Sequence, residues 1–217
     1  MTRTGFGDRH VRLEPLTLDH VDALVRAATR DRATFGLAPV PRDRAEMIDY
    51  VGSALADEQA GRALPFAIVR VPDAEIVGSI RLMNLEWWTW PPGPISVPGE
   101  PRRFSLSGGD PPDVAEIGHG WLEPSAQRTA VFSATCLLLL RHAFDTWRVH
   151  RLVLKTDARN ARSRAAILRL GGQFEGILRA HLPAADGVVR DTAMFSIVRA
   201  EWPAVRNRLE SALGGPL

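Results

Sequence analysis

Several side chains in the C-terminal half of the chain could accept or release a proton. They are Glu116, His119, Glu175, His181 and Asp191. Such a group is needed wherever an amine must attack, because an amine with a pKa of about 10 is mostly protonated at neutral pH. Side chains alternate along a strand, so Glu116 and His119 point to opposite faces unless a bulge intervenes. Each of these residues could instead form an ion pair or be an ordinary core or surface residue, and a relay through water without a dedicated base is a further alternative.

A second group of polar residues lies at the start of a predicted helix. Asn160 and Ser163 are three residues apart and therefore share one helix face. Asn160 is a favourable N-cap residue and Ser163 falls in the first turn, so capping alone would explain the pair. The pattern therefore leaves two interpretations open, a helix cap or a ligand contact.

The segment from Ser125 to Ala130 precedes the longest predicted helix. A helix start offers free backbone N–H groups and the positive end of the helix dipole, which together favour a phosphate group. Arg128 would add a positive charge there, or else be an ordinary surface residue. We predict an anion-binding loop at this position.

The elements that position these residues follow from apolar periodicity and turn signals. Strands are predicted at 10–16, 64–71, 76–85, 114–122, 152–156, 174–178 and 192–198, and helices at 17–30, 42–60, 126–148, 160–170 and 201–213. A strand, a long helix and a strand within 114–156 require a crossover, which predicts one parallel strand pair. We expect one α/β domain over residues 1–217.

An irregular segment interrupts this pattern at about 86–113. It holds Trp87, Trp88 and Trp90 together with seven prolines, which exclude a regular helix or central strand. We predict an insertion whose tryptophans line a substrate pocket, with a dimer interface or a cap on the core as alternatives.

Composition and charge exclude several classes of protein. The single cysteine, Cys136, rules out a disulfide framework, and we expect no metal. The net charge is only +2, with Lys155 the only lysine and no basic stripe for nucleic acid. No apolar run approaches the roughly 20 residues of a membrane helix, and no signal core begins the chain, so we expect a cytoplasmic protein without membrane partners.

The C-terminal half carries a series of motifs in a fixed order. They are EIGHGWLEP (116–124), QRTAV (127–131), LLLLRHAF (137–144), TDARNARSRAAILRLGG (156–172), FEGILR (174–179), DGVVRDTAMFSI (186–197) and EWPAV (201–205). This series resembles the GNAT superfamily of acetyltransferases, and more narrowly the branch of the ribosomal-protein N-terminal acetyltransferases. HVRLEPL (10–16) also matches that branch.

The resemblance implies a mixed, mostly antiparallel sheet flanked by helices, with the parallel strands 114–122 and 152–156 splayed to admit acetyl-CoA. It implies contacts to this cosubstrate from Trp121, Leu122, Gln127, Arg128, Thr129, Ala130, Asn160 and Ser163. Ser163 would also protonate the leaving thiolate, and Glu116 and His181 would serve the amine. His119 is expected at the acceptor site with the three tryptophans.

The sequence departs from the family pattern in two places. The loop after 122 lacks a glycine-rich phosphate pattern, and Phe132, Ala134 and Cys136 replace polar residues. The leading hypothesis is an N-acyltransferase that moves an acyl group from acyl-CoA to a small amine or a protein N-terminus. The alternative is an acyl-CoA-binding regulatory protein without catalysis. A homodimer is kept as an option.

Overall fold

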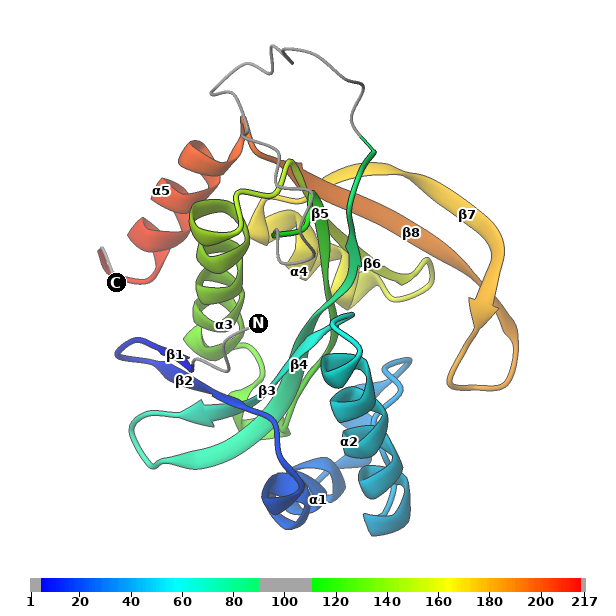
Figure 1. Ribbon diagram of the computed structural model, residues 1–217. Helices are drawn as coiled ribbons and strands as arrows, with labels where there is room; N and C mark the ends of the chain where they lie inside the picture. The colour runs from blue at the N-terminus through cyan, green and yellow to red at the C-terminus, as the bar shows by residue number, and fades with distance from the viewer. Residues whose placement is uncertain (1–4, 90–110, 216–217) are drawn as a thin grey trace.

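The computed structural model describes residues 5–89 and 111–215. Its described strands form a single eight-stranded sheet with the order β1-β2-β3-β4-β5-β6-β8-β7 (Figure 1). The strands are β1 (Phe6–Gly7), β2 (Val11–Pro15), β3 (Leu64–Arg70), β4 (Glu75–Glu86), β5 (Val114–Leu122), β6 (Arg151–Asp157), β7 (Gln173–Pro183) and β8 (Val189–Val198). The predicted fold class is confirmed, because the described neighbours pair antiparallel except for the parallel pair of β5 and β6.

The parallel pair is short, and this shapes the centre of the sheet. Its register runs from Val114 opposite Arg151 to Ile117 opposite Leu154. Beyond that point β5 continues along β4, while β6 continues along β8. The two strands therefore stop pairing halfway and leave a gap between them, as the resemblance implied.

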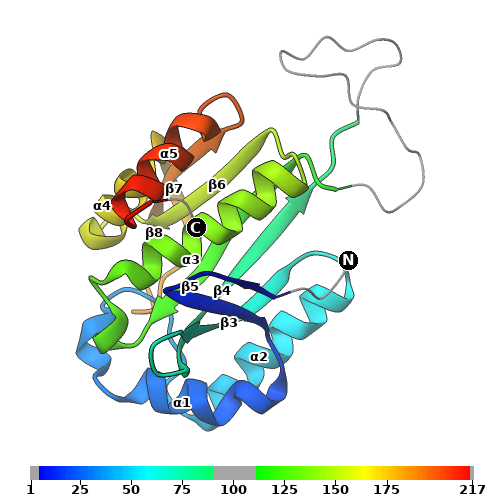
Figure 2. The ribbon, with the colours of Figure 1, turned by 90° about the vertical axis from the view of Figure 1, so that its left-hand side faces the viewer.

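Helices cover both faces of the sheet (Figures 1 and 2). One face carries α1 (Val21–Thr29) and α2 (Arg44–Gln59), and the other carries α3 (Ala130–Arg141), α4 (Ala161–Leu170) and α5 (Trp202–Ala212). Alternation along β3 explains the two layers: Ala67 packs with α1 and α2, whereas Phe66 and Ile68 belong to the core beneath α3. Burial of both faces requires the continuous apolar run of β3.

The element bounds differ from the sequence prediction chiefly around α3. The predicted helix 126–148 begins only at Ala130, because Pro124–Ala126 form a 3-10 turn and the Thr129 side chain caps the helix by accepting from the Val131 N–H. At its other end the helix widens into a π-helical turn, His142–Thr146. The short strand β1 and the 3-10 turn Arg32–Phe35 were not predicted.

The helix α4 begins and ends at the predicted signals. The Asn160 side chain accepts a hydrogen bond from the Ser163 N–H, and Gly171 closes the helix in the left-handed region at φ 105°. A Cβ at Gly171 would lie 2.8 Å from Val205 Cγ2, so glycine is also needed for the contact with α5. Among the described residues, no helix has the length and apolarity needed to cross a membrane.

Candidate active site

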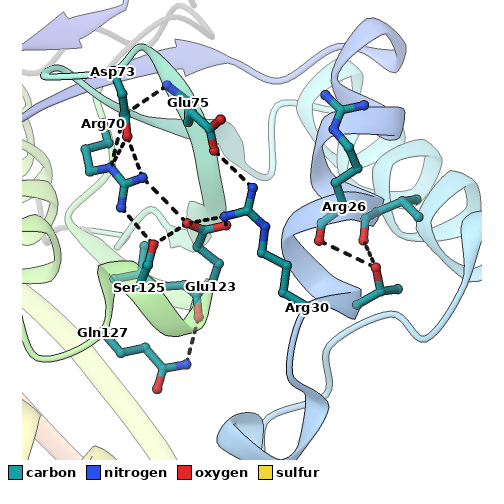
Figure 3. Close-up of polar contacts among 11 residues, drawn as sticks. Arg26, Arg30, Arg70, Asp73, Glu75, Glu123, Ser125 and Gln127 are labelled. Atoms are coloured by element: carbon teal, nitrogen blue, oxygen red, sulfur yellow. Dashed lines mark hydrogen bonds and ion pairs between the residues drawn. The ribbon is translucent and has the colours of Figure 1, made fainter.

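A buried carboxylate fixes the chain where it leaves β5. Glu123 is 1% exposed and forms ion pairs with Arg30 at 3.2 Å and Arg70 at 3.7 Å (Figure 3). The Ser125 hydroxyl donates to the same carboxylate. Arg30 caps the end of α1 and Arg70 ends β3, so these contacts tie the loop to both. Removing one partner of a buried ion pair is strongly destabilising, and this arrangement therefore holds the following loop in place.

The loop itself turns through an unusual backbone conformation. Arg128 has φ 61°, in the left-handed region where residues other than glycine pay a steric cost. Gln127 before it is extended, and the Thr129 side chain caps α3. Successive N–H groups in such a turn form a concave anion site at a helix start. Arg128 thus adopts a turn conformation that glycine reaches without this cost.

A cavity of about 490 Å³ opens in front of this loop, and we call it the helix-start cavity. It is lined by Phe35, Ala38, Gly120, Trp121, Leu122, Gln127, Arg128, Thr129, Phe132, Ser133, Asn160, Arg162, Ser163, Ala166 and Arg169. The lining includes all the predicted cosubstrate residues except Ala130, which begins α3. Trp121 is buried, and its indole N–H has no acceptor among the described residues.

Sequence reasoning missed the basic residues contributed by α4. Arg162 donates to the carbonyl oxygen of Thr34 at 2.5 Å and to Gln127 Oε1 at 3.2 Å, so it joins the loop after α1 to the loop before α3. Arg169 lines the same cavity two turns later. Their spacing of seven residues, which places both on one helix face, is the signal in the sequence that could have identified them.

The residues that depart from the family pattern are divided between core and cavity. Ala134 and Cys136 are fully buried in the core, and burial raises the pKa of the Cys136 thiol. Cys136 therefore packs the helix, as predicted. Phe132 instead lines the helix-start cavity, where it supplies an apolar wall.

A second cavity of about 480 Å³ contains Glu116, and we call it the Glu116 cavity. It is lined by Asp57, Arg62, Ala63, Met83, Asn84, Leu85, Glu86, Val114, Glu116, Val153, Lys155, Leu178, His181 and Met194. Of the residues predicted to act on the acceptor, Glu116 and His181 come together here. His119 does not line either cavity, and neither do Trp87 and Trp88.

Glu116 is held in one position by two donors. Glu116 is only 5% exposed, and its Oε2 accepts hydrogen bonds from Asn84 Nδ2 and Lys155 Nζ, both at 2.8 Å. Asn84 has φ 47°, and it lies where the register of β4 with β5 shifts. A Cβ at Gly118 would lie 3.1 Å from Glu116 Oε1 and 2.5 Å from Met83 Sδ, so a larger residue here would require both side chains to shift.

A bulge, which the sequence left open, is present in β5. Gly118 pairs with Arg81 and Trp121 pairs with Ser79, so His119 and Gly120 together oppose a single residue of β4. His119 has φ 50°, and its carbonyl accepts from the Tyr50 hydroxyl at 3.2 Å. His119 is an exposed residue by its accessible surface, but the protein atoms around its ring still lower the pKa of His119 to about 4, first by desolvation and then through the charges of Arg81 and Lys155.

The other proton-transfer candidates have defined structural partners. His181 Nδ1 lies 3.1 Å from Thr192 Oγ1 at the wall of the Glu116 cavity. Glu175 forms an ion pair with Arg151 outside that cavity, and this hydrogen-bonded guanidinium holds the pKa of the Glu175 carboxyl below its usual range. Asp191 accepts from the Ala180 N–H at 2.8 Å.

The tryptophans of the irregular segment lie apart from the cavities as far as they are described. Trp87 and Trp88 are 48% and 43% exposed. Trp88 stacks on His150 with ring centroids 5.4 Å apart, and its backbone N–H donates to Asp113 Oδ2 at 2.9 Å, so it connects the end of β4 to residues that precede β5 and β6. Trp90 lies outside the described residues, as does most of the predicted insertion.

Comparisons with known proteins agree with this architecture. The chain is 30% identical over 88 residues to the "Putative ribosomal N-acetyltransferase YdaF" of Bacillus subtilis, a match over 41% of this chain. The chain matches about half (47%) of that relative's length.

Solved structures extend the likeness to almost the whole chain. A GCN5-related N-acetyltransferase from Brucella melitensis superposes with a TM-score of 0.78 at 28% identity, over 99% of this chain and 87% of that one. Mycobacterium smegmatis RimJ, solved with CoA-disulfide, superposes with a TM-score of 0.70 at 24% identity, over 93% and 88% of the two chains. The family model described as an acetyltransferase (GNAT) domain matches residues 10–173, and the chain therefore belongs to the GNAT acetyltransferase family.

Proposed function

We propose that this chain is an acyl-CoA-dependent N-acyltransferase that transfers an acetyl group to a primary amine. One observation carries the proposal. The helix-start cavity is lined by residues 120–122 of β5, which lie beyond the point where β5 and β6 stop pairing at Ile117 and Leu154, and the Glu116 cavity is lined by Lys155, the first residue of β6 beyond that point. One cavity suits a phosphate-bearing donor and the other suits an amine, and the gap between the strands lets the two reactants meet.

The donor side fits acetyl-CoA by the chemistry of its lining. The backbone turn at Arg128 and the start of α3 suit a pyrophosphate, and Arg162 and Arg169 add positive charge. The unpartnered N–H of Trp121 and the amide of Asn160 are available to the polar pantetheine arm. We assign Gln127, Thr129, Leu122 and Ser163 to the same site because they line it, and Ala130 through its backbone N–H.

The acceptor side supplies a base and a pocket. Glu116 Oε1 is the oxygen not engaged by Asn84 and Lys155, and we assign it to take the proton of the attacking amine, directly or through water. His181 also lines this cavity and is the second candidate for the base. Direct attack in a ternary complex needs only that the two reactants be aligned across the gap.

Charge develops on the carbonyl oxygen and on sulfur during the transfer. The bulge at His119 and Gly120 removes two residues from regular pairing with β4, and an N–H there can be directed at the developing oxyanion. We assign Ser163 to protonate the thiolate, because its hydroxyl lines the donor cavity in the first turn of α4.

The acceptor is proposed to be a cationic amine, either a small molecule or a protein N-terminus. Asp57, Glu86 and Glu116 give the cavity three carboxylates against the two basic residues Arg62 and Lys155. The name of the Bacillus subtilis relative supports a ribosomal protein as one such acceptor. Cytoplasmic location and a homodimer remain predictions, as does contact of Trp87, Trp88 or His119 with the acceptor.

The proposal is tested by measuring binding and transfer separately. Isothermal calorimetry with acetyl-CoA and with desulfo-CoA should give saturable binding to the purified chain. Thiol release from acetyl-CoA should then rise above background with at least one member of a panel containing polyamines, amino sugars, amino acids and peptides with free N-termini.

The two parts of this experiment have different consequences. Absence of acetyl-CoA binding would overturn the proposal at the donor cavity. Binding without thiol release across the whole panel would instead favour the acyl-CoA-binding regulatory protein, the alternative of another class.

A further inference from the structure

The chain contains one lysine, and every other permanently cationic side chain is arginine. That lysine, Lys155, lines the Glu116 cavity. The difference between the two residue types is chemical, because a lysine nitrogen becomes a nucleophile once it loses a proton, whereas a guanidinium in a protein does not lose one. A charged neighbour for Glu116 could have been an arginine, so the presence of an amine here calls for a chemical explanation.

Lys155 also occupies a particular place along its strand. The last parallel pair joins Ile117 and Leu154, so Lys155 is the first residue of β6 beyond the ladder with β5. Side chains alternate along β6, and Lys155 shares with Val153 the face that lines the Glu116 cavity. Its side chain is 20% exposed. The amine therefore stands at the edge of the gap across which the donor and acceptor are proposed to meet.

A proton acceptor is already in contact with this amine. Lys155 Nζ lies 2.8 Å from Glu116 Oε2, a distance at which a proton can be transferred. The side chain that is proposed to activate the acceptor amine is thus also in place to activate Lys155. Four flexible methylene groups allow the nitrogen to move toward the gap without moving the backbone.

We propose that Lys155 is a self-acylation site, which takes the acyl group from bound acyl-CoA when no acceptor amine occupies the Glu116 cavity. This inference rests on the proposed function. The Lys155 ammonium gives one proton to Glu116, and its nitrogen forms a bond to the acyl carbon. The carbon–sulfur bond breaks and CoA leaves as the thiolate. The nitrogen loses a second proton as the amide forms, so one of its two protons passes to the sulfur through Glu116 or Ser163 and the other is released to solvent. The products are an amide at Lys155 and free CoA.

Acylation would change the Glu116 cavity in two ways. The amide carries no charge, so Glu116 loses its ion-pair partner, and the acyl group occupies space that the acceptor would use. An enzyme modified in this way is expected to lose transfer activity while it still binds CoA, because Lys155 does not line the helix-start cavity. Self-acylation would therefore occur when acyl-CoA is present in excess of the acceptor amine.

The experiment is mass spectrometry of the purified full chain after incubation with acetyl-CoA and no amine. The expected result is an acetyl group on the peptide that contains Lys155, at a rate per chain that does not depend on protein concentration. Because the chain has one lysine, the N-terminal amine is the internal reference for uncatalysed acetylation. Desulfo-CoA in excess should suppress the modification by competing for the donor cavity.

Two variants separate catalysed from adventitious modification. E116Q should slow acetylation of Lys155 by roughly 10²-fold, the usual contribution of a general base. K155R keeps a cation beside Glu116 but provides no amine, so the peptide that contains residue 155 should acquire no acetyl group and the activity of this variant should not decline during preincubation with acetyl-CoA.

The outcomes distinguish this inference from the proposed function. Thiol release with an external amine but an unmodified Lys155 would overturn self-acylation and leave the proposed function intact. Acetylation of Lys155 no faster than that of the N-terminal amine, or equally fast in E116Q, would overturn it as well. Acetylation of Lys155 without transfer to any external amine would support it. Bound acetyl-CoA with no transfer to any amine would overturn both.

Discussion

The two cavities differ in how the chain builds them. The helix-start cavity is assembled mostly from short contiguous stretches, 120–122, 127–133 and 160–169. The Glu116 cavity draws on α2, the loop after it and the strands β4, β5, β6, β7 and β8. Local sequence can encode the first, because a helix start binds anions through its own backbone. The second exists only when distant strands pair in the correct register.

The two cavities should therefore respond differently to substitution. Backbone N–H groups remain in place when a side chain is replaced, so acetyl-CoA binding in the helix-start cavity should tolerate single substitutions. Glu116, in contrast, relies on two side-chain donors at one oxygen and on the absence of a Cβ at Gly118. Changes in its surroundings should affect turnover more than they affect binding of acetyl-CoA.

The largest effect is expected for Glu116→Gln. This change keeps the shape of the side chain but removes its ability to take a proton, so kcat/KM for the amine should fall by about 10²- to 10⁴-fold. Calorimetry should find acetyl-CoA affinity nearly unchanged. Glu210→Gln is the matched control, because Glu210 also has a cationic partner, Arg206, but lies outside both cavities. Equal turnover in Glu116→Gln and Glu210→Gln would show that His181 or water, rather than Glu116, acts as the base.

A somewhat smaller loss is expected for Gly118→Ala. The new Cβ would collide with Met83 Sδ at 2.5 Å and crowd Glu116 Oε1 at 3.1 Å. Displacement of a catalytic group by about 1 Å can cost roughly 10²-fold in rate, so kcat should fall with little change in acetyl-CoA affinity. Gly52→Ala is the control, since a Cβ at Gly52 meets nothing within 4 Å. Wild-type kcat in Gly118→Ala would show that the position of Glu116 is not critical.

Asn160 tests whether the donor cavity depends on a side chain or only on a helix cap. Asn160→Asp retains an oxygen for the Ser163 N–H, whereas Asn160→Ala loses it and should lower the free energy of unfolding by about 1 kcal/mol. If the amide also binds the donor, Asn160→Asp should weaken acetyl-CoA binding by roughly 2- to 10-fold without loss of stability. If Asn160→Asp binds acetyl-CoA with wild-type affinity, Asn160 serves only as the N-cap of α4.

The smallest effect is a pH dependence of stability at His119. Its pKa is lowered from 6.5 to about 4, chiefly by burial, so the unfolded chain binds more protons between those values. Stability should therefore decrease as pH falls from 6.5 toward 4, and His119→Gln should weaken this decrease. Urea unfolding of both proteins at pH 7 and pH 4.5 measures the effect. If the free energy of unfolding changes equally between the two pH values in both proteins, the pKa of His119 is the same in the folded and the unfolded chain.

The sequence determined much of the fold and of the donor cavity. Apolar periodicity placed the strand Val114–Leu122 at its observed bounds, and Asn160 and Gly171 marked the two ends of α4. These signals are local, since a cap, a glycine stop or an alternating strand acts over a few residues. For the same reason the sequence alone predicts an anion-binding loop from Ser125 to Ala130, and this assignment stays a prediction.

Only the tertiary structure decided the contents of the Glu116 cavity. No spacing in the sequence relates Asn84 and Lys155 to Glu116, yet all three meet at one carboxylate oxygen because β4, β5 and β6 are neighbours in the sheet. The bulge at His119, permitted but not required by the sequence, also depends on the register with β4. Contacts between strands are fixed by pairing across the sheet, and pairing is a property of the whole fold rather than of any one segment.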